Sequence, residues 1–249
     1  MRVIAVIQAR LSSKRLPRKV MLDILGKPVI WHIYNRLTHC KHLSAVVIST
    51  GEYDQNKEIC DFAEKNQIKY YSGSEMDLIQ RLYQTVLKFD ADALVRITSD
   101  CPLVDPKLVD ELVGIYVKNK DICDLVTNCE IHSFPHGLDI EVYSHDVLRR
   151  LNDEIKEPDL REWFPLYITK NKQKFKILNI KNEQDLSRIR LTLDYPEDYD
   201  LIKKIYQNLA NKLPIPYMTD ILDLLKNQPD LLLINSKYVD HRNVDAPTV

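Results

Sequence analysis

Glycine is scarce in this chain, with 5 residues in 249, well below its usual share of roughly 7%. No GxGxxG cradle and no Walker GxxxxGK(S/T) loop is present, so any phosphate site depends on side chains. The GxSxG elbow and the HExxH motif are also missing, and the seven histidines are scattered. These absences disfavour P-loop kinases and ATPases, hydrolases with a nucleophile elbow, and zinc hydrolases.

Cysteine pairs, an excess of one charge and long apolar runs are lacking as well. The five cysteines form no CxxC pair, which disfavours a disulfide scaffold or a zinc site and points to a reducing cytoplasm. Lys plus Arg total 35 and Asp plus Glu 36, which excludes a broadly basic nucleic-acid binder. No apolar run approaches the roughly 18 residues of a membrane helix, and the apolar stretch at the N-terminus is too short for a signal peptide. We therefore expect a cytoplasmic protein that binds neither nucleic acid nor a membrane.

Strand and helix patterns alternate along the chain, which predicts an α/β fold with a mostly parallel central sheet flanked by helices. Strands are expected at Val3–Gln8, Ala45–Thr50, Tyr70–Tyr71, Ala93–Thr98, Asp124–Thr127, Gly137–Tyr143, Phe175–Ile180 and Arg190–Asp194. Helices are expected at Val29–Leu37, Asn56–Asn66, Asp77–Phe89, Pro106–Asn119, Ser144–Asn152, Asp159–Lys170, Pro196–Leu209 and Thr219–Lys226. No repeat or linker divides the chain, so residues 1–249 are expected to form one domain, with residues 130–190 as an inserted substrate-binding part.

A basic loop follows the first expected strand, with the sequence QARLSSKRLPRK at positions 8–19. From Arg10 to Lys19 it has five basic residues, no acidic residue and two serines, and Pro17 stiffens it. Open α/β sheets bind ligands beyond the carboxyl ends of their strands, where this loop falls. Arginine offers paired donors and lysine a point charge, so the loop suits a polyphosphate. The alternative is a solvated basic loop.

Carboxylates stand at the ends of two later strands and within a third. Asp100, in ITSDCP, and Asp194, in RLTLDYPED, could meet at one sheet edge and bind Mg²⁺ together with phosphate oxygens. A turn or helix-cap role is the alternative for each. Asp139 and Glu141 share one face of a strand, where they would contact a metal or a hydroxyl unless that face is solvated. The basic loop, the carboxylates and the sheet together suggest a nucleoside triphosphate and Mg²⁺.

These motifs resemble those of cytidylyltransferases that activate acidic sugars. The loop QARLSSKRLPRK is similar to the family signature QAR-x-G-S-x-R-L-P-G-K. The resemblance continues in order through GKPVIWHIYNRL, ISTGEYDQN, GSEMDLIQRLYQ, RITSDCPLVDP, FPHGLDIEVY, RLTLDYPEDYDLI and the late HRN. It spans nearly the whole chain. The nearest branch is the spore coat polysaccharide biosynthesis protein F family, with 3-deoxy-manno-octulosonate and acylneuraminate cytidylyltransferases as wider relatives.

The resemblance implies a Rossmann-like, glycosyltransferase-A-type nucleotidyltransferase fold and a homodimer. It implies a reaction in which CTP and an acidic sugar give a CMP-sugar and pyrophosphate, with Mg²⁺ held by Asp100 and Asp194. The implied nucleotide-binding positions are Gln8, Ala9, Arg10, Ser12, Ser13, Arg15, Lys19, Arg81 and Asp100, of which Arg10, Arg15, Lys19 and Asp100 are the expected catalytic residues. The implied acceptor positions are His136, Asp139, Glu141 and Arg161, and the segment 130–190 is expected to bind the acceptor or form the dimer.

Several positions depart from the family pattern. Ser12 and Arg18 stand where the signature has glycines, which permit positive φ or a close approach to phosphate. Ser99 replaces the glycine of GDCP. The segment REHVTP of the family reads REWFPL, so Trp163 replaces the histidine, as a packed residue or as a substrate platform, and Pro165 replaces the threonine. Two alternatives stay open: another nucleotide or a phosphorylated acceptor, and a non-catalytic binding subunit of a glycan pathway.

Overall fold

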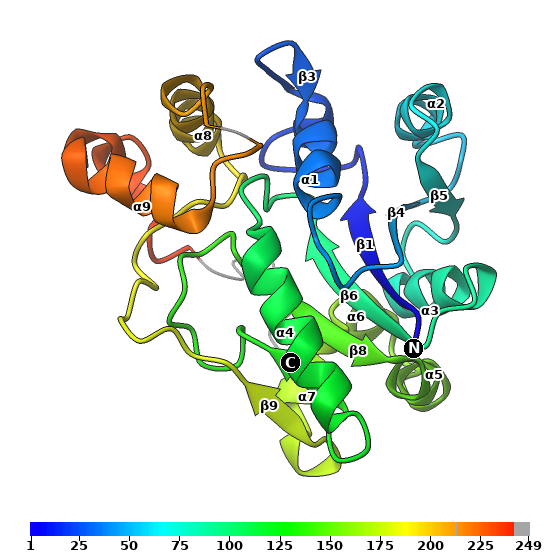
Figure 1. Ribbon diagram of the computed structural model, residues 1–249. Coiled ribbons are helices and arrows are strands. Elements are labelled where there is room, and N and C mark those ends of the chain that lie inside the picture. Colours follow the sequence, from blue (N-terminus) through cyan, green and yellow to red (C-terminus); the bar gives the residue numbers. More distant parts are fainter. Residues whose placement is uncertain (213, 242–249) are drawn as a thin grey trace.

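A mixed sheet forms the centre of the protein, as seen in a computed structural model that describes residues 1–212 and 214–241 (Figure 1). Within this part, seven strands follow the order β5-β4-β1-β6-β8-β7-β9. Their bounds are β1 Val3–Ala9, β4 Ala45–Thr50, β5 Lys69–Ser72, β6 Ala93–Thr98, β7 Leu125–Thr127, β8 Glu141–Ser144 and β9 Ile177–Asn179. A separate hairpin consists of β2 (Asp23–Ile24) and β3 (Lys27–Pro28).

The sheet is mostly parallel. β1 pairs in parallel with β4 and β6, as β4 does with β5 and β7 with β9. β8 alone among these seven strands runs antiparallel, between β6 and β7. The α/β fold class expected from the sequence is therefore confirmed.

Helices cover both faces of the sheet (Figure 1). Their bounds are α1 Val29–Leu37, α2 Lys57–Lys65, α3 Leu78–Lys88, α4 Pro106–Asn119, α5 His145–Glu154, α6 Pro158–Glu162, α7 Phe164–Lys170, α8 Pro196–Asn208 and α9 Met218–Asn227. Short 3-10 turns are η1 Lys19–Met21, η2 Lys172–Lys174, η3 Pro229–Leu233 and η4 Ser236–Tyr238. Successive residues of β1 face opposite sides, so Ala5 and Ile7 pack with α1, α2, α4 and α8, whereas Ile4 and Val6 pack with α3, α5 and α7. None of the described helices combines the length and apolar character that crossing a membrane requires.

Two expected strands are wrong in whole or in part. The strand expected at Gly137–Tyr143 begins only at Glu141, because Gly137 turns with φ 104° and Ile140 N donates to the Asn128 side chain at 2.8 Å. The segment 190–194 forms an isolated bridge with His136 and no strand. In both segments, backbone N–H groups donate to side chains or loop carbonyls and not to a neighbouring strand: Ile140 N donates to Asn128 Oδ1, and Leu191 N donates to the His136 carbonyl. An alternating pattern cannot distinguish these two situations.

The helix expected at Asp159–Lys170 is also wrong as a single element, since α6 and α7 meet at Trp163. Pro165 lacks an N–H group and its ring disfavours a continuous helix, so the chain turns at Trp163 with φ −107° and ψ 42°. This turn divides the expected helix into two short ones.

Residues 130–190 contribute β8 and β9 to the central sheet, besides α5, α6 and α7. Their predicted role in acceptor binding or dimer formation stays a prediction. Arg242 and Asn243 of the expected HRN motif lie outside the described residues.

Candidate active site

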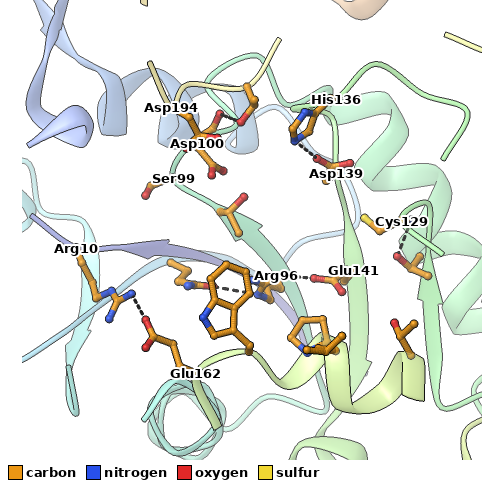
Figure 2. Close-up of a pocket in the computed structure, with 18 of the residues that line it drawn as sticks. Arg10, Arg96, Ser99, Asp100, Cys129, His136, Asp139, Glu141, Glu162 and Asp194 are labelled. Atoms are coloured by element: carbon orange, nitrogen blue, oxygen red, sulfur yellow. Dashed lines mark hydrogen bonds and ion pairs between the residues drawn. The ribbon is translucent and has the colours of Figure 1, made fainter. Parts of the chain in front are cut away.

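A cavity of about 600 Å³ lies at the carboxyl ends of β1 and β6, where open α/β sheets bind ligands (Figure 2). The loop 10–19, the turn after β6, the segment 127–141 and the helices α6 and α7 surround it. The sequence-predicted residues that line it are Gln8, Arg10, Ser12, Ser13, Arg15, Lys19, Asp100, His136, Asp139, Glu141 and Asp194. The structure thus brings together most of the predicted positions.

Glu75, in the segment before α3, ties down the basic loop. The Ser12 hydroxyl donates to Glu75 Oε1 at 2.7 Å, and Arg10 Nη1 donates to the Glu75 carbonyl at 2.7 Å. Arg10 also contacts α6, because Arg10 Nη2 lies 2.5 Å from Glu162 Oε1. The hydroxyl of Ser12, at a glycine position of the signature, therefore anchors the loop.

Lys19 lies between the two carboxylates that the sequence assigns to a metal. Its Nζ is 2.8 Å from Asp194 Oδ1 and 3.5 Å from Asp100 Oδ2, and Arg15 Nη2 is 3.0 Å from the same Asp194 oxygen. Burial acts to lower the pKa of Lys19, but the two carboxylates outweigh it and leave the pKa raised. Burial acts to raise the pKa of Asp100, but the Lys19 ammonium and a hydrogen bond from Thr98 lower it to about 2. Both groups are therefore charged at neutral pH.

The donor set at this point fits Mg²⁺. Asp100 and Asp194 converge on one cation, the Lys19 ammonium, and Mg²⁺ is commonly held by one or two carboxylates with phosphate oxygens. Among the described residues, no group of three or more His, Cys, Asp or Glu side chains is arranged to hold a metal ion without such help. Asp194 is not the helix cap, because Asp198 accepts the Tyr195 N–H at the start of α8, at 3.0 Å. The metal role of the two carboxylates stays a prediction.

The predicted acceptor residues His136, Asp139 and Glu141 line another wall of the cavity (Figure 2). Glu141 is 8% exposed, which excludes a solvated strand face. It pairs with Arg96 and accepts the Tyr143 hydroxyl at 2.7 Å. Burial acts to lower the pKa of Arg96, but the Glu141 carboxylate outweighs it and the pKa is raised. His136 Nε2 lies 3.9 Å from Asp139 Oδ2, so the imidazole and the carboxylate face each other on this wall.

Three predicted residues do not line the cavity: Ala9, Arg81 and Arg161. Ala9 is the buried last residue of β1. Arg81 Nη1 donates to the carbonyls of residues 74 and 75, and burial, together with the nearby Arg10 charge, lowers its pKa to about 10. Arg161 Nε lies 2.6 Å from Asp77 Oδ2, and its other nitrogens bind residues 152 and 155. Both arginines bind neighbouring protein groups, and this geometry gives no support to the prediction that they contact substrate directly.

Arg96, Glu75 and Glu162 were missed as individual site residues. Arg96 had a signal, because a lone arginine in the apolar strand ALVRIT needs a polar partner. Glu162 adjoins the predicted Arg161, but only the turn at Trp163 brings it to the cavity. For Glu75 the sequence carries no signal apart from its place in a family motif.

The departures from the family signature have visible structural consequences. Arg18 adopts φ 57°, the left-handed conformation that a glycine permits, and its side chain pairs with Glu58 at 2.6 Å, away from the cavity. Ser99 and Trp163 line the cavity. The platform interpretation of Trp163 is therefore favoured over a packed core residue.

Known proteins of similar sequence and fold define the family. The cytidylyltransferase family profile matches residues 4–213. A solved structure described as a cytidylyltransferase from Leptospira borgpetersenii serovar Hardjo-bovis is 33% identical, with a TM-score of 0.88, and the match covers 93% of this chain and 97% of that one.

Similar sequences include proteins of both known and unknown role. An uncharacterized protein of Methanocaldococcus jannaschii is 31% identical over 240 residues, covering 95% of each chain. The spore coat polysaccharide biosynthesis protein SpsF of Bacillus subtilis is 26% identical over 235 residues, covering 92% of this chain and 95% of its own. The 3-deoxy-manno-octulosonate cytidylyltransferase of Geobacter metallireducens is 29% identical over 122 residues, 49% of this chain and 47% of its own. The chain therefore belongs to the cytidylyltransferase family and is a nucleotidyltransferase enzyme.

Proposed function

We propose that this protein transfers CMP from CTP to an acidic sugar of the nonulosonate or octulosonate type, with Mg²⁺ as cofactor and release of pyrophosphate, for surface glycan biosynthesis. The observation that carries the proposal is the convergence of Lys19 on Asp100 and Asp194, beside Arg10 and Arg15, in one cavity. The names of the spore coat polysaccharide and octulosonate relatives support the glycan pathway and the acidic acceptor.

In the proposed reaction, the sugar hydroxyl attacks the α-phosphorus of CTP in line and pyrophosphate leaves. Arg10, Arg15 and Lys19 bind the triphosphate and neutralise the charge that develops on the leaving group. Asp100 and Asp194 would hold Mg²⁺, which would supply positive charge to the phosphate oxygens and to the attacking hydroxyl. The acceptor wall with His136, Asp139 and Glu141 orients the sugar through hydrogen bonds to its hydroxyls.

A second candidate acceptor follows from the charges on this wall. Asp139 and Glu141 both line this wall, and the Arg96 guanidinium is already paired with Glu141. This charge balance favours hydroxyl recognition and provides no unengaged arginine for a sugar carboxylate on this wall. The acceptor screen should therefore include neutral sugars beside acidic ones.

The first experiment is a thermal-shift screen of the four ribonucleoside triphosphates, with and without Mg²⁺, because a ligand of the native state raises the apparent melting temperature. We expect a Mg²⁺-dependent shift with CTP, followed by acceptor-dependent pyrophosphate release. A shift with UTP or ATP alone would identify a different nucleotidyltransferase. No shift with any nucleotide would favour the non-catalytic binding subunit and contradict the proposal.

A homodimer and a cytoplasmic location complete the proposal. Light scattering coupled to size-exclusion chromatography tests the first, and fractionation of the source cells tests the second. A monomer at micromolar concentration would contradict the dimer.

A further inference from the structure

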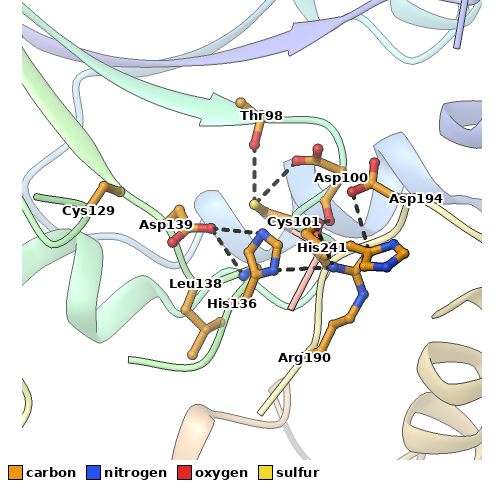
Figure 3. A network of polar contacts seen from close by, with 12 residues as sticks. Thr98, Asp100, Cys101, Cys129, His136, Leu138, Asp139, Arg190, Asp194 and His241 are labelled. Carbon is orange, nitrogen blue, oxygen red and sulfur yellow. Dashed lines mark hydrogen bonds and ion pairs between the residues drawn. The ribbon is translucent and has the colours of Figure 1, made fainter. Parts of the chain in front are cut away.

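Arg190 occupies a buried position between the proposed metal carboxylate and the acceptor wall (Figure 3). Its side chain is 1% exposed. Nη2 lies 3.5 Å from Asp194 Oδ2, and Nη1 lies 3.4 Å from His136 Nδ1. One guanidinium therefore contacts residues of two segments that the sequence separates by more than fifty positions.

The two oxygens of Asp194 have different kinds of partners. Oδ1 contacts Lys19 at 2.8 Å and Arg15 at 3.0 Å, and both of these are proposed triphosphate ligands. Oδ2 faces Arg190. If Lys19 and Arg15 turn to a triphosphate, Oδ1 loses its partners and can accept a metal, whereas Oδ2 keeps its own. Arg190 would thus hold the carboxylate in place while its other oxygen changes partner.

Arg190 is itself fixed by Asp198, which is fully buried. Asp198 binds Arg190 through two parallel contacts, Nε to Oδ1 at 2.9 Å and Nη2 to Oδ2 at 2.8 Å. The same carboxylate accepts the backbone N–H groups of Asp194 and Tyr195, each at 3.0 Å. The backbone and the side chain of Asp194 are therefore held by one rigid pair, and the planar fork of arginine is what allows this geometry.

The C-terminal segment, beyond the residues matched by the family profile, completes this support. Asn235 Nδ2 lies 2.8 Å from Asp198 Oδ1 and 3.1 Å from the Arg190 carbonyl. Tyr238 stacks on Tyr195, with ring centroids 3.8 Å apart, and both rings lie near the Arg190 guanidinium. Asn235 and Tyr238 thus add contacts to the Asp198 carboxylate, the Arg190 backbone and the Arg190 guanidinium.

We infer that Arg190 is a positioning residue that orients Asp194 toward the metal and couples it to the acceptor wall through His136. This inference rests on the proposed function, because it assigns Asp194 to a metal. A lysine at this position would keep the charge but has no planar fork with which to contact Asp198, Asp194 and His136 together. Residues that orient metal ligands typically contribute roughly 10–100-fold to metal affinity.

The test compares the Mn²⁺ affinities of the wild type and Arg190→Lys, measured by electron paramagnetic resonance in the presence of CTP and without acceptor. A titration of CTP with Mn²⁺ in the absence of protein corrects for the metal that CTP binds by itself. We expect Arg190→Lys to weaken Mn²⁺ binding roughly 10–100-fold. In turnover assays it should raise the Mn²⁺ concentration for half-maximal rate more than it raises the KM for CTP at saturating metal. Arg188→Lys is the matched control, because Arg188 is 79% exposed and pairs only with the equally exposed Asp240 among the contacts described.

The outcomes separate this inference from the proposed function. A folded Arg190→Lys protein with unchanged Mn²⁺ affinity would overturn the positioning role and leave the metal site intact. A wild type that binds no Mn²⁺ beyond that bound by CTP would overturn both. If circular dichroism shows that Arg190→Lys does not fold, Asn235→Ala decides instead: weakened Mn²⁺ binding supports the inference, and unchanged binding by the folded variant overturns it.

Discussion

Lys19 and Asp194 are 175 positions apart in the sequence, and their side chains meet at 2.8 Å in the candidate active site. The ammonium belongs to the last residue of the basic loop, and the carboxylate precedes α8. The ion pair therefore joins the loop after β1 to the segment before α8, near the end of the residues that the family profile matches. It lies at the centre of the proposed active site.

Substitution of Lys19 by alanine should weaken CTP binding in the presence of Mg²⁺ by roughly 10–100-fold. A charge-assisted hydrogen bond is worth about 1.5–3 kcal/mol, and this one would be lost to the triphosphate. Isothermal titration calorimetry gives the affinity. Arg18→Ala is the control, since Arg18 belongs to the same loop but pairs with Glu58 outside the cavity. Equal affinities of Lys19→Ala and wild type would mean that the basic loop is only a solvated surface.

Asp100→Asn and Asp194→Asn should each abolish Mg²⁺-dependent pyrophosphate release, with a fall on the order of 10²–10³ or more. The two variants should differ in stability. The Asp194 side chain is 7% exposed and contacts three cations, whereas that of Asp100 is 27% exposed and contacts Lys19. Thermal unfolding should therefore show a larger loss for Asp194→Asn. Normal activity in either variant would contradict the metal assignment.

Gly137→Ala should destabilise the protein by roughly 2–5 kcal/mol, through strain and overlap together. Gly137 has φ 104°, and a Cβ there would lie 2.5 Å from the backbone of Leu191 and Thr192. Gly114→Ala is the control within α4, because its nearest contacts are 3.9 Å away in the His42 ring. That change should stabilise the helix by about 1 kcal/mol. Urea unfolding measures both, and equal effects would contradict the close approach at Gly137.

Arg18→Gly should be more stable than Arg18→Ala by roughly 0.5–1 kcal/mol. Both variants lose the exposed pair with Glu58, so their difference isolates the backbone at φ 57°. A left-handed conformation costs an L-residue about 1–2 kcal/mol, and the entropy of glycine in the unfolded chain offsets part of the relief. Differential scanning calorimetry resolves such a gap. A more stable alanine variant would mean that the loop has relaxed to another conformation.

The elements with strong local signals were predicted correctly from the sequence. β6 and α4 have the expected bounds, because an apolar run defines the strand, and Asp105 followed by Pro106 defines the helix start. Asp105 Oδ1 accepts the N–H groups of residues 107 and 108. The antiparallel insertion of β8 and the irregular path of residues 190–194 depend on Asn128 and Gly137, which act through distant contacts that have no local pattern.

The candidate site could be predicted from the sequence where charged residues directly follow a strand. Arg15, Lys19 and Asp100 converge as expected, because the parallel strands β1 and β6 bring their carboxyl ends to one edge. Asp194 joins them from the irregular segment 190–194, although a strand was expected there. The partner of Arg10 could not be predicted, since Glu162 lies 152 positions away on a helix that ends at an unexpected turn. Burial of ion pairs between distant segments decides which charges face a ligand, and periodicity carries no information about it.

The contact between Lys19 and Asp194 makes ligand entry an exchange of ions. A triphosphate that binds Lys19 and Arg15 removes two of the three cationic partners of Asp194, and a divalent ion that binds Asp194 releases the same two cations. Either ligand alone would leave one sign of charge uncompensated in a buried place, whereas both together restore neutrality. Nucleotide and metal would therefore raise each other's affinity by the same factor, as thermodynamic reciprocity demands. Through this coupling, the concentration of free Mg²⁺ would control how tightly the enzyme holds its nucleotide.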